Sequence, residues 1–143
     1  MSEEKTVYVP MVADILHHGH INILKIAASY GKVIVGLQAD EVAASYKRVP
    51  YMPFESRKIV VESIRYVAEV VKQEEMDYER ILRKLRPDYM VHGDDWQKGV
   101  LTGIRDTAIR VMQEWGGIVI EPKYTEGVSS TLIQSRIKTR DKI

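Results

Sequence analysis

The stretch TVYVPMVADILHHGHINILKIAASYGKVIVGL, residues 6–37, decides the fold. It begins with a β-branched apolar run at residues 6–12 and ends with a second such run at residues 32–37. Between these runs, apolar residues recur at helical spacing over residues 21–28, and Gly31 is expected to close that helix. Two strands joined through a helix are typical of a parallel βαβ unit, so the stretch predicts an α/β fold.

The remainder of the chain repeats this alternation without internal repeats or a flexible linker. In the helix that Pro53 opens, Val60, Ile64 and Val67 are expected to face inward. Right-handed crossovers then give one domain over residues 1–143, a doubly wound, Rossmann-like, five-stranded parallel sheet with helices on both faces. The further elements are predicted as strands at residues 68–72, 88–93 and 118–122, helices at 53–67, 78–85 and 101–115, and a short helix after residues 129–131.

Composition excludes several classes of function. The chain has 143 residues, 45% of them hydrophobic, which suits one globular core. Its 21 basic and 20 acidic residues give a net charge of +1, so we expect neither polymeric nucleic acid nor a membrane as a partner. The sequence has no cysteine, which excludes disulfides and thiolate chemistry. No apolar run approaches membrane-spanning length and the amino terminus has no signal-like core, so a cytoplasmic protein is predicted.

The carboxyl ends of the predicted strands carry the unusual side chains, and ligands of this fold class bind there. His17 and His20 stand three apart at the start of a helix, where backbone N–H groups lack intrahelical partners and attract anions. Gly19 between them would let a ligand approach the backbone. Two imidazole donors at such a point suit the stabilisation of charge on a phosphoryl group. A zinc site, with Asp14 or His92 as further ligands, and simple helix capping are the alternatives.

Two more loops and one helix support a phosphate site. Lys47 and Arg48 follow the second strand on a loop with two prolines, and a mobile lysine there can close over a triphosphate. Arg57 and Arg65 lie on the next helix, roughly on one face. In the late stretch TEGVSST, residues 125–131, hydroxyl groups precede a short helix, although plain N-capping explains them equally well.

The stretch HGDDW, residues 92–96, ends the fourth strand. Asp94 and Asp95 could accept hydrogen bonds from an amine or a ribose, or could bind magnesium. Trp96 could pack on a base or against the core. Neither GxGxxG nor GxxxxGK[ST] occurs, so the sequence contains no dinucleotide fingerprint and no P-loop.

In order along the chain, HHGH, GDDW and TEGVSST resemble the motifs of the HxGH nucleotidylyltransferases, and within them the small cytidylyltransferases, from about Val7 to Ile137. The segments ADILHHGH, ASYKRVPY, PDYMVHGDDW and EWGG are most similar to the cytidylyltransferases of phosphonate biosynthesis, a domain also found fused to phosphoenolpyruvate phosphomutase. The chain is also similar to glycerol-3-phosphate cytidylyltransferase.

This resemblance implies transfer of CMP from CTP. Magnesium is expected to be held mainly by the CTP phosphates, with no metal ligands of certain identity in the protein. The protein is also expected to form a homodimer. It implies catalytic roles for His17, His20 and Lys47. The implied nucleotide-binding residues are Val12, Ala13, Asp14, Gly19, Arg57, Arg65, Gly93, Asp94, Asp95, Trp96, Thr125, Ser129, Ser130 and Thr131. The implied acceptor-binding residues are Met11, His18, Arg48 and Tyr124.

Two differences bear on the acceptor. The glycerol-3-phosphate enzymes read GTFD where this chain reads MVAD, residues 11–14, and they carry an arginine where this chain has Tyr124, with Lys123 one place away. Both differences favour a small phosphonate of hydroxyethyl, aminoethyl or formyl type over glycerol 3-phosphate. Transfer to glycerol 3-phosphate or to phosphocholine is the alternative. The same motifs leave two other functions open. The protein could be a nucleotide-binding sensor without turnover, or it could be an adenylyltransferase.

Overall fold

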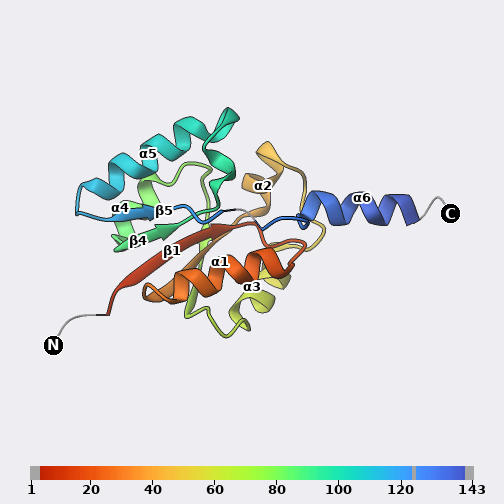
Figure 1. Ribbon diagram of the computed structural model, residues 1–143, viewed down its shortest axis with the longest axis horizontal. Coiled ribbons are helices and arrows are strands. Elements are labelled where there is room, and N and C mark those ends of the chain that lie inside the picture. The colour runs from red at the N-terminus through yellow and green to blue at the C-terminus, as the bar shows by residue number, and fades with distance from the viewer. Residues whose placement is uncertain (1–3, 124, 141–143) are drawn as a thin grey trace.

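The computed structural model describes residues 4–123 and 125–140, and it confirms a five-stranded parallel sheet with helices on both faces (Figure 1). The sheet order is β3-β2-β1-β4-β5, and every neighbouring pair is parallel. The order reverses after β1, so the carboxyl ends of β1 and β4 flank the switch point where ligands of such sheets bind. The strands are β1 Thr6–Met11, β2 Lys32–Gln38, β3 Glu69–Gln73, β4 Tyr89–Val91 and β5 Ile118–Ile120.

Two hydrophobic cores lie on opposite faces of the sheet, because successive side chains of a strand point to opposite sides. Val7 and Val9 of β1 pack with α1 and α3, whereas Tyr8 packs with α4 and α5. The helices are α1 His18–Ala28, α2 Asp40–Tyr46, α3 Phe54–Glu62, α4 Glu79–Leu85, α5 Thr102–Gln113 and α6 Ser130–Arg140, with 3-10 turns η1 Asp94–Trp96 and η2 Gly99–Leu101. None of the helices within the described ranges is long and apolar enough to cross a membrane.

Two helices differ from the predictions. Helix α2 was not predicted; its first turn carries Asp40 and Glu41, whose charges favour a helix amino terminus. Helix α3 ends at Glu62 and not at residue 67. The prediction that Val60 faces inward was wrong, since Val60 is 42% exposed and the neighbouring Val61 is fully buried.

The first helix ends without help from a left-handed glycine. Ser29 caps α1 in a right-handed conformation, so Gly31 is not the cap that the sequence indicated. Gly31 is needed for space: a Cβ on it would lie 2.4 Å from the carbonyl oxygen of Lys5. The same oxygen accepts a hydrogen bond from the N–H of Lys32, which joins the start of β1 to the start of β2.

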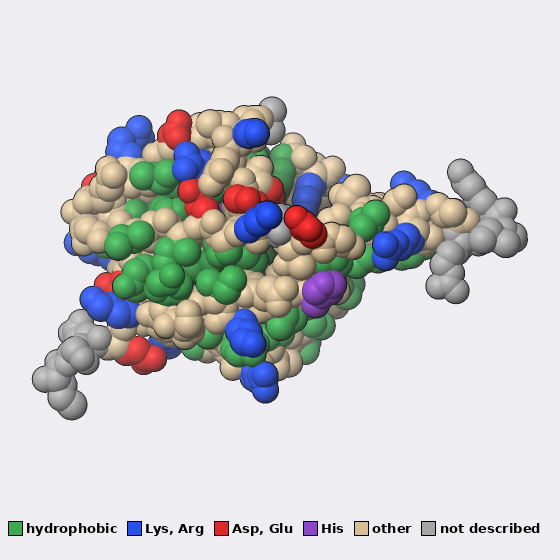
Figure 2. Space-filling view, in the orientation of Figure 1, with side chains coloured by type: hydrophobic (Ala, Val, Ile, Leu, Met, Phe, Trp, Pro, Cys, Tyr) green, Lys and Arg blue, Asp and Glu red, His purple; other side chains and the backbone are tan. Residues whose placement is uncertain are grey.

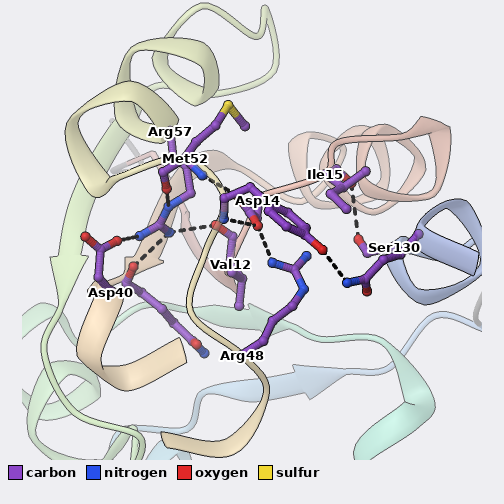
Figure 3. A network of polar contacts seen from close by, with 11 residues as sticks. Val12, Asp14, Ile15, Asp40, Arg48, Met52, Arg57 and Ser130 are labelled. Carbon is purple, nitrogen blue, oxygen red and sulfur yellow. Dashed lines mark hydrogen bonds and ion pairs between the residues drawn. The ribbon is translucent and has the colours of Figure 1, made fainter. Parts of the chain in front are cut away.

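A completely buried arginine ties the carboxyl ends of β1 and β2 to the loop before α3 (Figure 3). The Nη1 of Arg57 donates to the carbonyl oxygens of Val12 at 2.8 Å and Gln38 at 2.9 Å. Its Nε donates to the carbonyl oxygen of Met52 at 3.0 Å, and its Nη2 pairs with Asp40 at 2.5 Å. Strand-end carbonyls need donors when they are buried, and this one guanidinium supplies several.

We expect Arg57→Met to lower the free energy of unfolding by about 3 kcal/mol, because it leaves buried carbonyl groups without donors. The matched variant Arg65→Met removes an exposed guanidinium from the following turn and should change stability by less than about 0.5 kcal/mol. Urea unfolding of both variants and the wild type measures the difference. Equal midpoints for the two variants would contradict the anchoring role of Arg57.

Candidate active site

A pocket opens at the carboxyl edge of the sheet, where β1, β2 and β4 end and α1 begins. Most of the residues that the sequence indicated meet in it although they are far apart in the chain. Those that line the pocket are Met11, Val12, Ala13, Asp14, His17, Gly19, His20, Lys47, Arg48, Gly93, Asp95, Trp96, Thr125 and Ser130. Thus the three early, middle and late motifs surround one cavity.

His17 and His20 cap the amino terminus of α1 and each other. The Nδ1 of His17 accepts a hydrogen bond from the N–H of Gly19 at 3.1 Å, and the Nδ1 of His20 accepts one from the N–H of His17 at 3.2 Å. The two ring centroids are 4.1 Å apart. Because Nδ1 is the acceptor in both rings, a neutral imidazole must carry its proton on Nε2. Helix capping therefore fixes both histidines as Nε2–H donors.

The surroundings keep both rings neutral. Burial, together with the neighbouring His17 and Lys47, lowers the pKa of His20 to about 4. Burial, with His18 and Lys47, also lowers the pKa of His17. Neutral rings at neutral pH can donate to an anion through Nε2–H without breaking the cap, since Nδ1 stays unprotonated.

Gly19 has a different role from the one expected. A Cβ on Gly19 would lie 2.8 Å from Cε1 and 2.9 Å from Nδ1 of His17. The His17 ring occupies the space that a side chain at this position would need, and Gly19 also lines the pocket. The glycine of the HHGH stretch thus permits the capping geometry.

Asp14 organises the loop that leads to α3. Its carboxylate accepts hydrogen bonds from the N–H groups of Tyr51 at 2.8 Å and Met52 at 2.9 Å, and it pairs with Arg48 at 2.5 Å (Figure 3). Burial would raise the pKa of Asp14, but Arg48 and these two N–H groups more than offset that effect and lower it. The side chain of Arg48 also lies 4.3 Å from the centre of the Tyr51 ring. The charge of Arg48 is therefore largely balanced by Asp14 and the Tyr51 ring.

Lys47 stands beside Arg48 and lines the pocket. Burial lowers the pKa of Lys47, and the Asp95 carboxylate on the far side of the pocket partly offsets this. Unlike its neighbour, Lys47 has no ion pair within 4.0 Å among the described residues. Its ammonium group is available to an anionic ligand.

After the end of β4, Trp96 is fully buried and packs in the core, although it also lines the pocket. Its Nε1 donates to Glu121 at 2.6 Å, and Arg105 holds the same carboxylate through Nε at 2.7 Å and Nη2 at 2.8 Å. The Arg105 guanidinium is the main reason that the pKa of Glu121 falls to about 2. This ion pair fixes the indole in place.

The segment before α6 is held against α1. Asn22 donates to the hydroxyl of Thr125 at 3.2 Å, and the hydroxyl of Ser130 donates to the carbonyl oxygen of Ile15 at 3.2 Å. The hydroxyl of Ser129 accepts from the N–H of Leu132 at 2.9 Å, which is ordinary N-capping. Gln134 of α6 also donates to the hydroxyl of Tyr51, and beyond it the helix projects from the body and carries Lys and Arg side chains (Figure 2).

Several predicted residues do not line the pocket. The structure corrects the phosphate-binding prediction for Arg57, because Arg57 is buried behind the strand ends and its donors serve backbone carbonyls and Asp40. Arg65 is exposed after α3, and Tyr124 lies outside the described residues. The other predicted residues that the pocket does not include are His18, Asp94, Ser129 and Thr131.

Sequence reasoning missed other pocket residues. Gln38 is the last residue of β2 and His92 directly follows β4, so the strand-end rule could have found both in the pocket. The sequence had indicated His92 only as an alternative zinc ligand. Tyr46, Met76 and Tyr78 carried no such signal, because their approach depends on how α2 and the β3–α4 loop pack. Within the described ranges, no group of three or more His, Asp or Glu side chains is placed to hold a metal ion.

Comparisons with known proteins agree with this geometry. The family described as Cytidylyltransferase-like matches residues 11–136. Glycerol-3-phosphate cytidylyltransferase from Staphylococcus aureus is 35% identical over 134 residues, which cover 90% of this chain and 91% of that protein. The enzyme of the same name from Bacillus subtilis is 32% identical over 126 residues, 87% of this chain and 90% of that protein.

Solved structures support the fold alone. A lipopolysaccharide core biosynthesis protein from Thermoplasma volcanium superposes with a TM-score of 0.72 at 24% identity, over 86% of this chain and 100% of that one. A pantothenate synthetase from Thermus thermophilus superposes with a TM-score of 0.67 at 14% identity, over 99% of this chain and 66% of that one. With the family match over residues 11–136, the chain belongs to the cytidylyltransferase-like family and is a nucleotidyltransferase.

Proposed function

We propose that the protein transfers CMP from CTP to an oxygen of a small phosphonate of hydroxyethyl, aminoethyl or formyl type, with release of pyrophosphate. The observation that supports this most is the pair of neutral Nε2–H donors of His17 and His20 at the amino terminus of α1, in a pocket that Lys47 also lines. Such donors bind oxyanions. The rings cannot bind zinc while the cap is formed, because Nδ1 accepts a backbone hydrogen bond and Nε2 carries a proton.

The proposed reaction is an in-line displacement. An acceptor oxygen forms a bond to the α-phosphorus, the bond from that phosphorus to the bridging oxygen breaks, and pyrophosphate leaves with the electron pair. His17 and His20 donate to the oxygens on which charge develops, and Lys47 neutralises the phosphates from its loop. Magnesium enters as part of the nucleotide substrate and spreads charge over the phosphates. The other pocket residues, Asp95, Trp96, Thr125 and Ser130, surround the remainder of the nucleotide.

The choice of acceptor rests on a difference in sequence. Met11 lines the pocket at the end of β1, in the MVAD segment that differs from the GTFD of the glycerol-3-phosphate enzymes. The side chain at position 11 is larger than in those enzymes and the one at position 13 is smaller, so this end of the pocket has a different shape, which supports a different acceptor. Glycerol 3-phosphate is the second candidate, because two enzymes named for it are 35% and 32% identical to this chain over most of its length. The homodimer and the cytoplasmic location stay predictions.

The preference of the protein for one nucleotide over another can be measured from the change in its melting temperature. We expect CTP with magnesium to raise the melting temperature more than ATP with magnesium at equal concentration, because a ligand that binds the folded state more tightly stabilises it more, with the logarithm of its affinity. The measurement is a thermal-shift titration, with magnesium alone as the control. Equal shifts would argue for a base-independent nucleotide site and against cytidylyl transfer.

The two histidines can be tested without disturbing the helix cap. Asn at position 17 or 20 keeps a side-chain acceptor near the place of Nδ1 but has no donor at the place of Nε2. We expect His17→Asn and His20→Asn each to lower kcat by about 100-fold to 1000-fold and to change the Kd for CTP by less than about threefold, since the donors act mainly in the transition state. Steady-state kinetics and calorimetry measure the two quantities. A parallel loss of CTP affinity would show a ground-state binding role instead.

The proposed function is tested by phosphorus NMR of the protein with CTP and magnesium. The acceptors, added one at a time, are hydroxyethylphosphonate, aminoethylphosphonate, phosphonoformate, glycerol 3-phosphate and phosphocholine. Pyrophosphate and a new mixed anhydride with one phosphonate are the expected result. Reaction with glycerol 3-phosphate alone would overturn the phosphonate assignment and keep the enzyme class, and CTP binding without any reaction would favour a sensor.

A further inference from the structure

A third histidine faces the pocket and has no role in the mechanism above. His92 follows β4 at the switch point of the sheet. Its ring stacks on Trp96 with 3.7 Å between centroids and 6° between planes, and the Tyr78 ring meets it edge-on at 6.3 Å. Because the Glu121 carboxylate and Arg105 hold Trp96, the His92 ring rests on a fixed surface.

The hydrogen bond of His92 fixes its tautomer. Nδ1 lies 2.8 Å from the carbonyl oxygen of Gly93, and a carbonyl can only accept, so Nδ1 carries the proton. Burial lowers the pKa of His92, although the Gly93 carbonyl, Asp95 and Glu121 partly offset this, and the ring is neutral at neutral pH. Nε2 therefore presents a lone pair, and within the described part of the chain no donor is placed to bond it.

The pocket histidines thus have opposite polarity. His17 and His20 present Nε2–H donors, which suit phosphate oxygens, whereas the Nε2 of His92 is an acceptor. The ionised phosphate oxygens of a nucleoside triphosphate carry no hydrogen to share, and they would repel that lone pair. Only a part of the substrates that carries N–H or O–H groups can lie there favourably.

Building on the proposed function, we propose that His92 is a specificity-determining residue whose Nε2 accepts a hydrogen bond from an N–H or O–H group of the substrates. Two sources have this chemistry: the exocyclic amine or ribose hydroxyls of the nucleotide, and the hydroxyl or amine of the acceptor. A site built to bond such a group rejects an analogue that lacks it, because the acceptor atom of the site is then left without a partner.

Two variants separate this bond from packing. His92→Phe keeps an aromatic ring for the stack on Trp96 and removes Nε2, whereas His92→Gln keeps an acceptor oxygen near the place of Nε2. Melting temperature and tryptophan fluorescence check that both variants fold like the wild type. Calorimetry compares the Kd values of CTP, UTP and 2′-deoxyCTP. Kinetics compare kcat/KM for hydroxyethylphosphonate and ethylphosphonate, and for glycerol 3-phosphate and 1,2-propanediol 1-phosphate.

We expect His92→Phe to reduce one of these preferences by at least about tenfold and His92→Gln to retain most of it. If the preference for CTP over UTP falls, the bonded group is the amine of cytosine. If the preference for CTP over 2′-deoxyCTP falls, it is a ribose hydroxyl. If the preference within an acceptor pair falls, it is the hydroxyl of the acceptor. The proposal is overturned if His92→Phe keeps every preference that the wild type shows among these compounds. Loss of the proposed function has a different signature, because the wild type would then form no pyrophosphate with any acceptor, while the nucleotide affinities would still test His92.

Discussion

The carboxyl edge of the sheet depends on the burial of one guanidinium. Parallel strands that end inside a protein leave carbonyl groups to be satisfied, and Arg57 supplies donors to the ends of β1 and β2 and to the loop before α3. The carboxylate of Asp14 holds the other side of the same loop through two backbone N–H groups and Arg48. Lys47 reaches the pocket because these contacts fix the loop that carries it.

The polarity of the three pocket histidines comes from hydrogen bonds within the protein and not from formal charge. The cap of α1 forces the protons of His17 and His20 onto Nε2, whereas the Gly93 carbonyl forces the proton of His92 onto Nδ1. Burial lowers the pKa of all three rings, so each keeps its tautomer at neutral pH. Preorganised donors of this kind need no rearrangement when charge develops on a bound group.

Much of the fold and part of the site could be predicted from the sequence. The β-branched runs and helical spacing gave the five strands and most helices, and the strand-end rule brought His17, Lys47 and Asp95 to one edge. The errors have physical reasons. Arg57 was assigned to phosphate binding, since nothing in a linear pattern shows that strand-end carbonyls need its donors. Val60 and Val61 are equally apolar, and only packing decides which one is buried.

The sequence by itself determined the α/β class, the early and late motifs, and the absence of thiol chemistry, because these follow from residue type and local spacing. The tertiary structure alone decided which nitrogen of His92 carries the proton, and that Glu121 and Arg105 hold Trp96 beneath His92. These features arise from contacts between residues far apart in the chain, as between Trp96 and Glu121 or Val12 and Arg57. A linear pattern has no information on which distant donor meets which acceptor, since folding sets those distances.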